Sequence, residues 1–275
     1  MKILLMTDLE GVAGVKNWVD WCGIDSRFYA QACRLLTGEV NAAVDGFFAG
    51  GATYIEVADG HGPGGIDVEL LDPRSEYARG WPEGTWPFGL DSSFDGLAFV
   101  GQHPKAGTEF GHLCHTQNFS YIDLSVNGLS IGEFGQLTLC AGELGVPVFF
   151  ASGDLAFTQE AEALVPGITV CAVKRGVTSG SGDECFHEAY RMRNAGAVHK
   201  APARACGLIR AAAENAVKAL LERPPGLCKL DAPFHLDAVF RPEKEGEKRT
   251  VARTSHPLSF IELMKSPIER KPLSE

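Results

Sequence analysis

Short apolar runs rich in β-branched residues alternate with longer segments of helical period, and this rhythm limits the chain to a few folds. Each apolar run is short enough to be a strand: residues 3–6, 53–58, 97–101, 121–126, 146–151 and 168–173. Helices are expected between several of them, over residues 28–48, 135–144 and 157–164. The alternation predicts an α/β fold with a mainly parallel central sheet flanked by helices.

The rhythm ends near residue 175, and a different pattern follows. An Ala-rich helix is expected over residues 201–221, before Pro224 and Pro225 stop it. Residues 234–240 then alternate between apolar and polar, as in a half-buried strand. We therefore predict an α/β domain over residues 1–200 and a smaller C-terminal α+β subdomain over residues 201–275, packed on the first.

Charge and cysteine spacing exclude several classes of function. The chain has 25 Lys and Arg against 35 Asp and Glu, a net charge of −10, so it offers no basic surface for nucleic acid. Its opening apolar run is too short for a secretory signal, and no segment approaches the 18 or so apolar residues of a membrane span. The eight cysteines form no CxxC pair. We expect a cytoplasmic protein with mostly buried free thiols.

Acidic and imidazole side chains follow three of the predicted strands at the point where each ends. Asp8 and Glu10 follow the first strand, Asp59 and His61 the second, and His103 the third. The carboxyl ends of strands in an open α/β sheet meet at one edge, where ligands bind. Side chains two residues apart in an extended segment point the same way, so each pair can face one cavity.

Carboxylates and imidazoles without a thiolate suit Zn²⁺, Mn²⁺ or Co²⁺, and a carboxylate can bridge two ions about 3.5–4 Å apart. Each residue also has an ordinary structural explanation: Asp8 as a cap, Glu10 as a solvated acid, His61 and His103 as hydrogen-bonded loop residues. For any one of these residues taken alone, the structural role is a better interpretation than a metal ligand. For the whole set at three strand ends, a metal site is the better interpretation.

Two further segments add candidates for the site. Residues 101–116 carry His112 and His115 beside His103, and one of these imidazoles is expected to be catalytic. Glu133 lies at the start of a predicted helix, where a carboxylate also complements the helix dipole. Spacing alone favours this electrostatic role for Glu133.

Residues 62–93 are rich in Gly, Pro and Trp and are expected to form a long irregular segment of the kind that carries function. Trp81 and Trp86 in this segment, with Trp18 and Trp21 near the start of the chain, are candidate pocket walls or contact residues. Core packing is the more ordinary role for such side chains.

Several short motifs taken together resemble the D-aminopeptidase family, peptidase family M55, typified by the D-aminopeptidase of a dipeptide-transport operon. The resemblance covers most of residues 1–220. It is carried by segments spread along the chain: DLEGVAG at 8–14, DGH at 59–61, FVGQH at 99–103, HT at 115–116, GEFG at 132–135, ASGD at 151–154 and AVK at 172–174.

The resemblance implies a site with two zinc ions per subunit. Five ligands are implied, with Asp8 bridging the ions, Glu10 and His61 on one, and His103 and Glu133 on the other. The active-site histidine of the family corresponds best to His115, and His112 is its competitor.

The activity implied by the resemblance is hydrolysis of the N-terminal bond of short peptides that begin with a D-residue, such as D-Ala-D-Ala. His115 would move protons or attack as a nucleophile, and both roles stay open. The family forms homo-oligomers, decamers of two pentameric rings, and assembly is implied here too. Two alternatives remain: another metal-dependent hydrolase, either an amidohydrolase or a phosphoesterase, or a noncatalytic peptide-binding oligomer.

Overall fold

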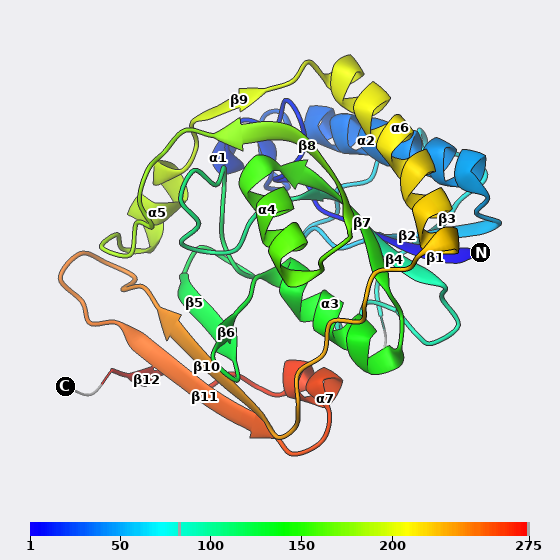
Figure 1. Cartoon of the computed structure of the whole chain (residues 1–275). Helices are drawn as coiled ribbons and strands as arrows, with labels where there is room; N and C mark the ends of the chain where they lie inside the picture. Colours follow the sequence, from blue (N-terminus) through cyan, green and yellow to red (C-terminus); the bar gives the residue numbers. More distant parts are fainter. Residues whose placement is uncertain (82–83, 274–275) are drawn as a thin grey trace.

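A central sheet of seven strands organises the molecule (Figure 1). The computed structural model describes residues 1–81 and 84–273. The strands lie in the order β3-β2-β1-β4-β7-β8-β9, and all neighbours are parallel except β8 and β9. Their bounds are β1 Lys2–Thr7, β2 Tyr54–Asp59, β3 Glu76–Ala78, β4 Gly96–Gln102, β7 Val148–Asp154, β8 Thr169–Gly176 and β9 Ala197–His199. The predicted α/β fold with a mainly parallel sheet is confirmed.

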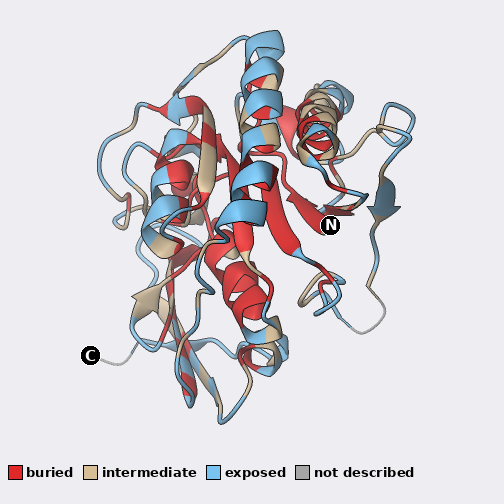
Figure 2. Ribbon diagram, turned by 45° about the vertical axis from the view of Figure 1, so that its right-hand side comes forward, coloured by how far each residue is buried: buried red, intermediate tan, exposed pale blue. Residues whose placement is uncertain are grey.

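Helices cover both faces of this sheet. Helices α2 (Tyr29–Gly50) and α6 (Pro202–Glu222) lie side by side on one face, and α3 (Glu133–Leu144) and α4 (Leu155–Leu164) cover the other (Figure 1). Alternate side chains of β1 serve the two layers, because successive residues of a strand point to opposite faces. Ile3 and Leu5 pack with α2 and α6, whereas Leu4 and Met6 pack with α3 and α4. The central strands are therefore buried on both sides (Figure 2).

A second, antiparallel sheet has the strand order β12-β11-β10-β5-β6. Its strands are β5 Tyr121–Val126, β6 Leu129–Ser130, β10 Phe234–Phe240, β11 Thr250–His256 and β12 Lys271–Pro272. Residues 121–126 do form a strand, but its expected place in the series of βα units is wrong. Asn127 and Gly128 both have positive φ, 50° and 80°, which suits a tight turn and folds β5 back on β6 as a hairpin.

The second sheet thus draws strands from residues 121–130 as well as from the last part of the chain, and α6 packs on α2. A domain boundary between residues 200 and 201 stays a prediction. The sequence gives no clear signal for three short helices: α1 (Trp18–Trp21), α5 (His187–Arg193) and α7 (Phe260–Lys265).

Two expectations about composition can be compared with the described residues. All eight cysteines are free and five of them are buried, which agrees with the prediction of mostly buried thiols. Among the helices of residues 1–81 and 84–273, we find none with the length and apolar character needed to span a bilayer.

Candidate metal centre and active site

The carboxyl ends of β2, β1 and β4 lie next to one another in the central sheet, and the chain after each strand enters one cavity of about 590 Å³. The five ligands and the active-site histidine implied by the family resemblance come together here. Five line the cavity: Asp8, Glu10, His61, His115 and Glu133. The sixth, His103, is buried directly beside Asp8 and Glu133.

Two glycines allow the loop after β1 to lie against the end of β4. Gly101 has a φ of +79°, and a Cβ there would lie 2.0 Å from the carbonyl oxygen of Asp8. A Cβ on Gly11 would lie 2.1 Å from the carbonyl oxygen of Gln102. Any side chain at either position would push the two segments apart, so these glycines hold Asp8 close to His103.

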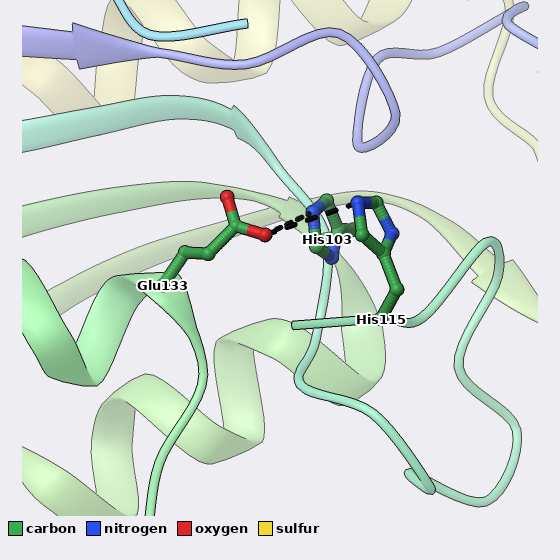
Figure 3. Close-up of side chains that lie close together, drawn as sticks. All are labelled: His103, His115 and Glu133. Atoms are coloured by element: carbon green, nitrogen blue, oxygen red, sulfur yellow. Dashed lines mark ion pairs between the residues drawn. The ribbon is translucent and has the colours of Figure 1, made fainter. Parts of the chain in front are cut away.

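The two carboxylate oxygens of Asp8 face two different histidines. Asp8 Oδ1 lies 3.2 Å from His61 Nδ1, and Asp8 Oδ2 lies 3.2 Å from His103 Nε2. Glu10 Oε2 is 3.1 Å from the same nitrogen of His61. Glu133 Oε1 is 3.6 Å from His103 Nε2 (Figure 3). Asp8 therefore lies between His61 and Glu10 on one side and His103 and Glu133 on the other. A carboxylate that bridges two ions would occupy this position.

Main-chain carbonyls fix which ring nitrogen of each histidine carries the proton. A carbonyl oxygen only accepts hydrogen bonds, so the nitrogen facing it must donate. The donors and acceptors are His61 Nε2 to Cys22 O at 2.8 Å, His103 Nδ1 to Pro104 O at 2.9 Å, and His115 Nδ1 to Leu113 O at 2.8 Å. In each neutral ring the other nitrogen then carries a lone pair, and in all three it faces a carboxylate.

A lone pair aimed at a carboxylate is repulsive unless a cation or a proton lies between them. Glu10 Oε2 and His103 Nε2 are buried and have no hydrogen-bond partner among the described residues. This arrangement fits divalent metal ions, because metal-bound histidines commonly donate their second ring N–H to a carbonyl or carboxylate. Imidazole nitrogens and carboxylate oxygens also form a donor set that zinc accepts.

The pKa values show how strongly this site favours positive charge. Burial acts to lower the pKa of His103, but Glu133 and Asp8 outweigh it and raise that pKa to about 10. Burial likewise opposes protonation of His61, yet Glu10 and Asp8 raise its pKa well above the ordinary value. The pKa of Asp8 is lowered despite its burial, because the neighbouring rings of His103 and His61 favour the ionised carboxylate.

Comparison with known proteins gives the family. Residues 1–256 match the D-aminopeptidase family, peptidase M55. A D-aminopeptidase of Bacillus subtilis (strain 168) is 33% identical over 196 residues, which cover 69% of each chain. The chain belongs to the D-aminopeptidase family. It is a peptidase, a hydrolase of peptide bonds, and the resemblance seen in the sequence is confirmed.

A solved structure has the same fold as this D-aminopeptidase family member. It is described as the zinc-dependent D-aminopeptidase DppA from Bacillus subtilis, a self-compartmentalizing protease. The two superpose with a TM-score of 0.80 at 23% sequence identity, covering 96% of this chain and 94% of the other. The resemblance in fold extends through both sheets.

Glu133 and His115 close the site on the side of α3 (Figure 3). Glu133 begins this helix, and its Oε1 accepts a hydrogen bond of 2.7 Å from the main-chain N–H of Gln117. Burial raises the pKa of Glu133 to about 7. Burial and the neighbouring His103 lower the pKa of His115 to about 3, so His115 is neutral at pH 7 with a lone pair on Nε2.

Two other candidates from the sequence have structural partners. His112 is buried, its Nε2 donates to Lys16 O at 2.9 Å, and it does not line the cavity. Asp59 lines the cavity, but its carboxylate accepts hydrogen bonds from Gly65 N and from the hydroxyl of Tyr77. Asp59 therefore shapes the loop that carries His61.

Some of the tryptophans line the cavity and one packs in the core. Trp18, Trp81 and Trp86 line the cavity, as candidate pocket walls would. Trp21 is only 5% exposed and belongs to the core beside α2.

Two residues that support the candidate ligands were not predicted from the sequence. Gln102 donates from Nε2 to Asp8 Oδ2 at 2.9 Å, and its position next to His103 at a strand end was a usable signal. Arg79 donates to three main-chain carbonyls around His61, those of Asp59, His61 and Gly62. No local pattern marks Arg79, because its role depends on a loop 20 residues earlier in the chain.

Proposed function

We propose that this chain is a zinc-dependent aminopeptidase that holds two zinc ions per subunit and hydrolyses short peptides with an N-terminal D-residue, such as D-Ala-D-Ala. One observation carries the proposal: the two oxygens of Asp8 face ring nitrogens of two different histidines, in each case the nitrogen that is not bonded to a main-chain carbonyl. The description of Bacillus subtilis DppA as zinc-dependent supports the choice of metal.

The contacts support a ligand assignment. Asp8 would bridge the two ions, Glu10 and His61 would complete one site, and His103 and Glu133 the other. Two divalent cations in this position supply Lewis-acid activation of water and of the scissile carbonyl. Gln102, which donates to Asp8, would hold the bridging carboxylate in place.

His115 would be the group that moves protons. Its Nδ1 is held by the carbonyl of Leu113, which leaves Nε2 as a base at the wall of the cavity. Nε2 would take the proton of the attacking water and return it to the leaving amine. The ring is held at Nδ1, and among the described residues it has no hydrogen bond to another side chain, so the lone pair on Nε2 is available for proton transfer.

Assembly and location are part of the same proposal. The description of DppA as self-compartmentalizing supports a homo-oligomer, and we propose the decamer of two pentameric rings expected for the family. Eight free cysteines support a reducing compartment, the cytoplasm. Light scattering on the eluting peak of a gel-filtration column measures the assembly: about ten chains per particle are expected, and a monomeric particle contradicts the decamer.

The activity is tested by elemental analysis of the purified protein together with a hydrolysis panel. We expect about two zinc ions per chain and faster cleavage of D-Ala-D-Ala than of L-Ala-L-Ala. Release of phosphate from a phosphoester, with no cleavage of either dipeptide, would assign the site to a phosphoesterase instead. Tight binding of D-Ala-D-Ala without turnover by the zinc-loaded protein would mark a noncatalytic peptide-binding protein.

A further inference from the structure

The lining of the cavity consists of two chemically different sets of side chains. One set is the acidic and imidazole cluster described above. The other is apolar and aromatic, and it comes from the sheet, from helices α1 and α3, and from residues 62–93, here called the Trp-containing loop. Its members include Met6, Trp18, Trp81, Trp86, Phe88, Phe99 and Leu137.

The apolar set adjoins the ligands because the same elements carry both. Met6 precedes Asp8 by two residues in an extended segment, so the two side chains point to the same side. Leu137 follows Glu133 by four residues on α3, which places both on one side of that helix. A peptide held at the ligand cluster would therefore have an apolar surface directly beside it.

Three aromatic rings extend this surface outward. The ring of Phe88 lies between Trp81 and Trp86, with centroid distances of 5.0 Å to each and edge-to-face geometry. All three side chains pack against the core that contains Met6, Phe99 and Leu137, yet remain only partly buried. When a ligand side chain covers partly buried aromatic rings that face a cavity, the burial of apolar surface favours binding.

The cavity offers little to an acidic side chain. Among the described residues that line it, Arg79 alone carries a guanidinium or ammonium group. Both terminal nitrogens of Arg79 already donate to main-chain carbonyls, those of Asp59, His61 and Gly62. Binding a substrate carboxylate through Arg79 would cost the hydrogen bonds that hold the His61 loop.

We infer that the aromatic wall formed by Trp81, Trp86 and Phe88 is a side-chain subsite, and that the preferred peptides carry a bulky apolar or aromatic side chain next to the scissile bond. This inference rests on the proposed function. A cavity of about 590 Å³ is far larger than a dipeptide of two alanines fills. The wall would then select among D-peptides rather than perform chemistry.

A panel of four peptides tests the inference on the zinc-loaded wild-type protein: D-Ala-D-Ala, D-Phe-D-Ala, D-Ala-D-Phe and D-Glu-D-Ala. We expect kcat/KM for at least one phenylalanine peptide to exceed that for D-Ala-D-Ala by roughly tenfold or more, since the ring is buried in the subsite. D-Glu-D-Ala should be the poorest substrate, because Arg79, the one cation among the described lining residues, already donates to main-chain carbonyls.

Phe88→Ala removes the central ring of the wall and should abolish the preference for phenylalanine, measured as the ratio of kcat/KM for the better phenylalanine peptide to kcat/KM for D-Ala-D-Ala in the same preparation. Phe110→Ala is a matched control. Phe110 is also an aromatic residue with positive φ, 57° against 58° for Phe88, but it is exposed and lies outside the cavity lining. Retained cleavage of D-Ala-D-Ala also shows that Phe88→Ala has folded.

The outcomes separate the inference from the proposed function. If D-Ala-D-Ala is cleaved as fast as both phenylalanine peptides, or if Phe110→Ala loses the preference as fully as Phe88→Ala, the subsite is wrong and the peptidase assignment stands. If the zinc-loaded protein cleaves none of the four peptides, the proposed function fails and the inference fails with it.

Discussion

His103 and His115 stack face to face, with ring centroids 3.8 Å apart and an angle of 16° between the ring planes. The two rings are nonetheless oriented for different tasks. His103 points Nε2 at Asp8 and Glu133 at 3.2 and 3.6 Å, whereas His115 Nε2 is 3.8 Å from Glu133. His115 also contacts the ring of Phe119, at 4.5 Å between centroids. Ring contacts and the Leu113 carbonyl thus orient His115, which leaves Nε2 available for the proton transfer that we propose.

His115→Ala should retain about two zinc ions per chain and lower kcat by at least about 10², the lower end of the effect of losing a general acid–base group. The metal is expected to remain because Asp8, Glu10, His61, His103 and Glu133 are unchanged. Elemental analysis and steady-state kinetics on the same preparation measure both quantities.

His235→Ala is the control for this substitution, because His235 is exposed on β10, outside the cavity lining. It should leave both quantities unchanged. If His115→Ala loses one zinc ion per chain, His115 is a ligand with His103 and Glu133, since the ligand atoms of these three lie within 4.8 Å of one another.

Asp8→Ala should remove most of the bound metal, because it removes the one carboxylate shared by both halves of the site. It also leaves the nitrogens of His61 and His103 without the negative charge between them. Asp25→Ala, at an exposed acidic residue outside the cavity lining, is the control. Full zinc content in Asp8→Ala, measured by elemental analysis after desalting, is incompatible with a bridging role.

The part of the site that follows from local pattern could be predicted from the sequence. Asp8, His61 and His103 each follow a buried parallel strand, and the ends of such strands must lie at one edge of the sheet. The prediction needs only the strand positions and the topology of an α/β fold. Long helices such as α2 and α6 could also be predicted from the sequence, because their apolar spacing repeats over many turns.

Features that depend on partners distant in sequence could not be predicted. Residues 121–126 have the apolar pattern of a strand, but nothing in that pattern selects β10 as the neighbour. Spacing alone gave Glu133 a role at the helix dipole, whereas its contacts with His103 and with Gln117 N come from other segments. Arg79 acts through main-chain carbonyls, which any sequence supplies, so no residue type in the loop reveals its target.

Arg79→Lys should weaken zinc binding at the His61 side of the site by roughly 10- to 100-fold, the usual effect of losing a group that orients a ligand. The planar guanidinium reaches the carbonyls of Asp59, His61 and Gly62 at 2.8, 3.1 and 2.6 Å. A lysine ammonium keeps the charge but cannot reproduce this fork. Titration of the apoprotein with zinc against a competing chelator measures the affinity of each site.

Arg74→Lys is the matched control for Arg79→Lys. Arg74 is also an arginine of residues 62–93, but it pairs with the carboxylates of Asp72 and Asp45 on the surface. Its replacement should leave both zinc affinities unchanged. Equal zinc affinities in Arg79→Lys and the wild type would show that the His61 loop holds its shape without the guanidinium.

Glu39→Gln should stabilise the protein relative to the wild type increasingly as the pH rises from 5 to 8. Glu39 on α2 is buried and accepts a hydrogen bond from Ala13 N at 2.9 Å, and burial raises its pKa to about 7 from an ordinary 4.5.

The sign follows from proton linkage. Between pH 4.5 and 7 the unfolded chain ionises Glu39 while the folded protein keeps it protonated, so the stability that this group contributes at low pH is lost as the pH rises through 7. The full shift corresponds to about 3 kcal/mol.

Glutamine keeps an oxygen for the Ala13 N–H and does not titrate. The difference in unfolding free energy between variant and wild type, measured with urea at pH 5 and pH 8, should therefore grow by about 2–3 kcal/mol. Glu162→Gln, at an exposed residue on α4, is the control and should show no such growth. If the difference in unfolding free energy for Glu39→Gln stays constant with pH, Glu39 is already ionised in the folded protein at pH 5.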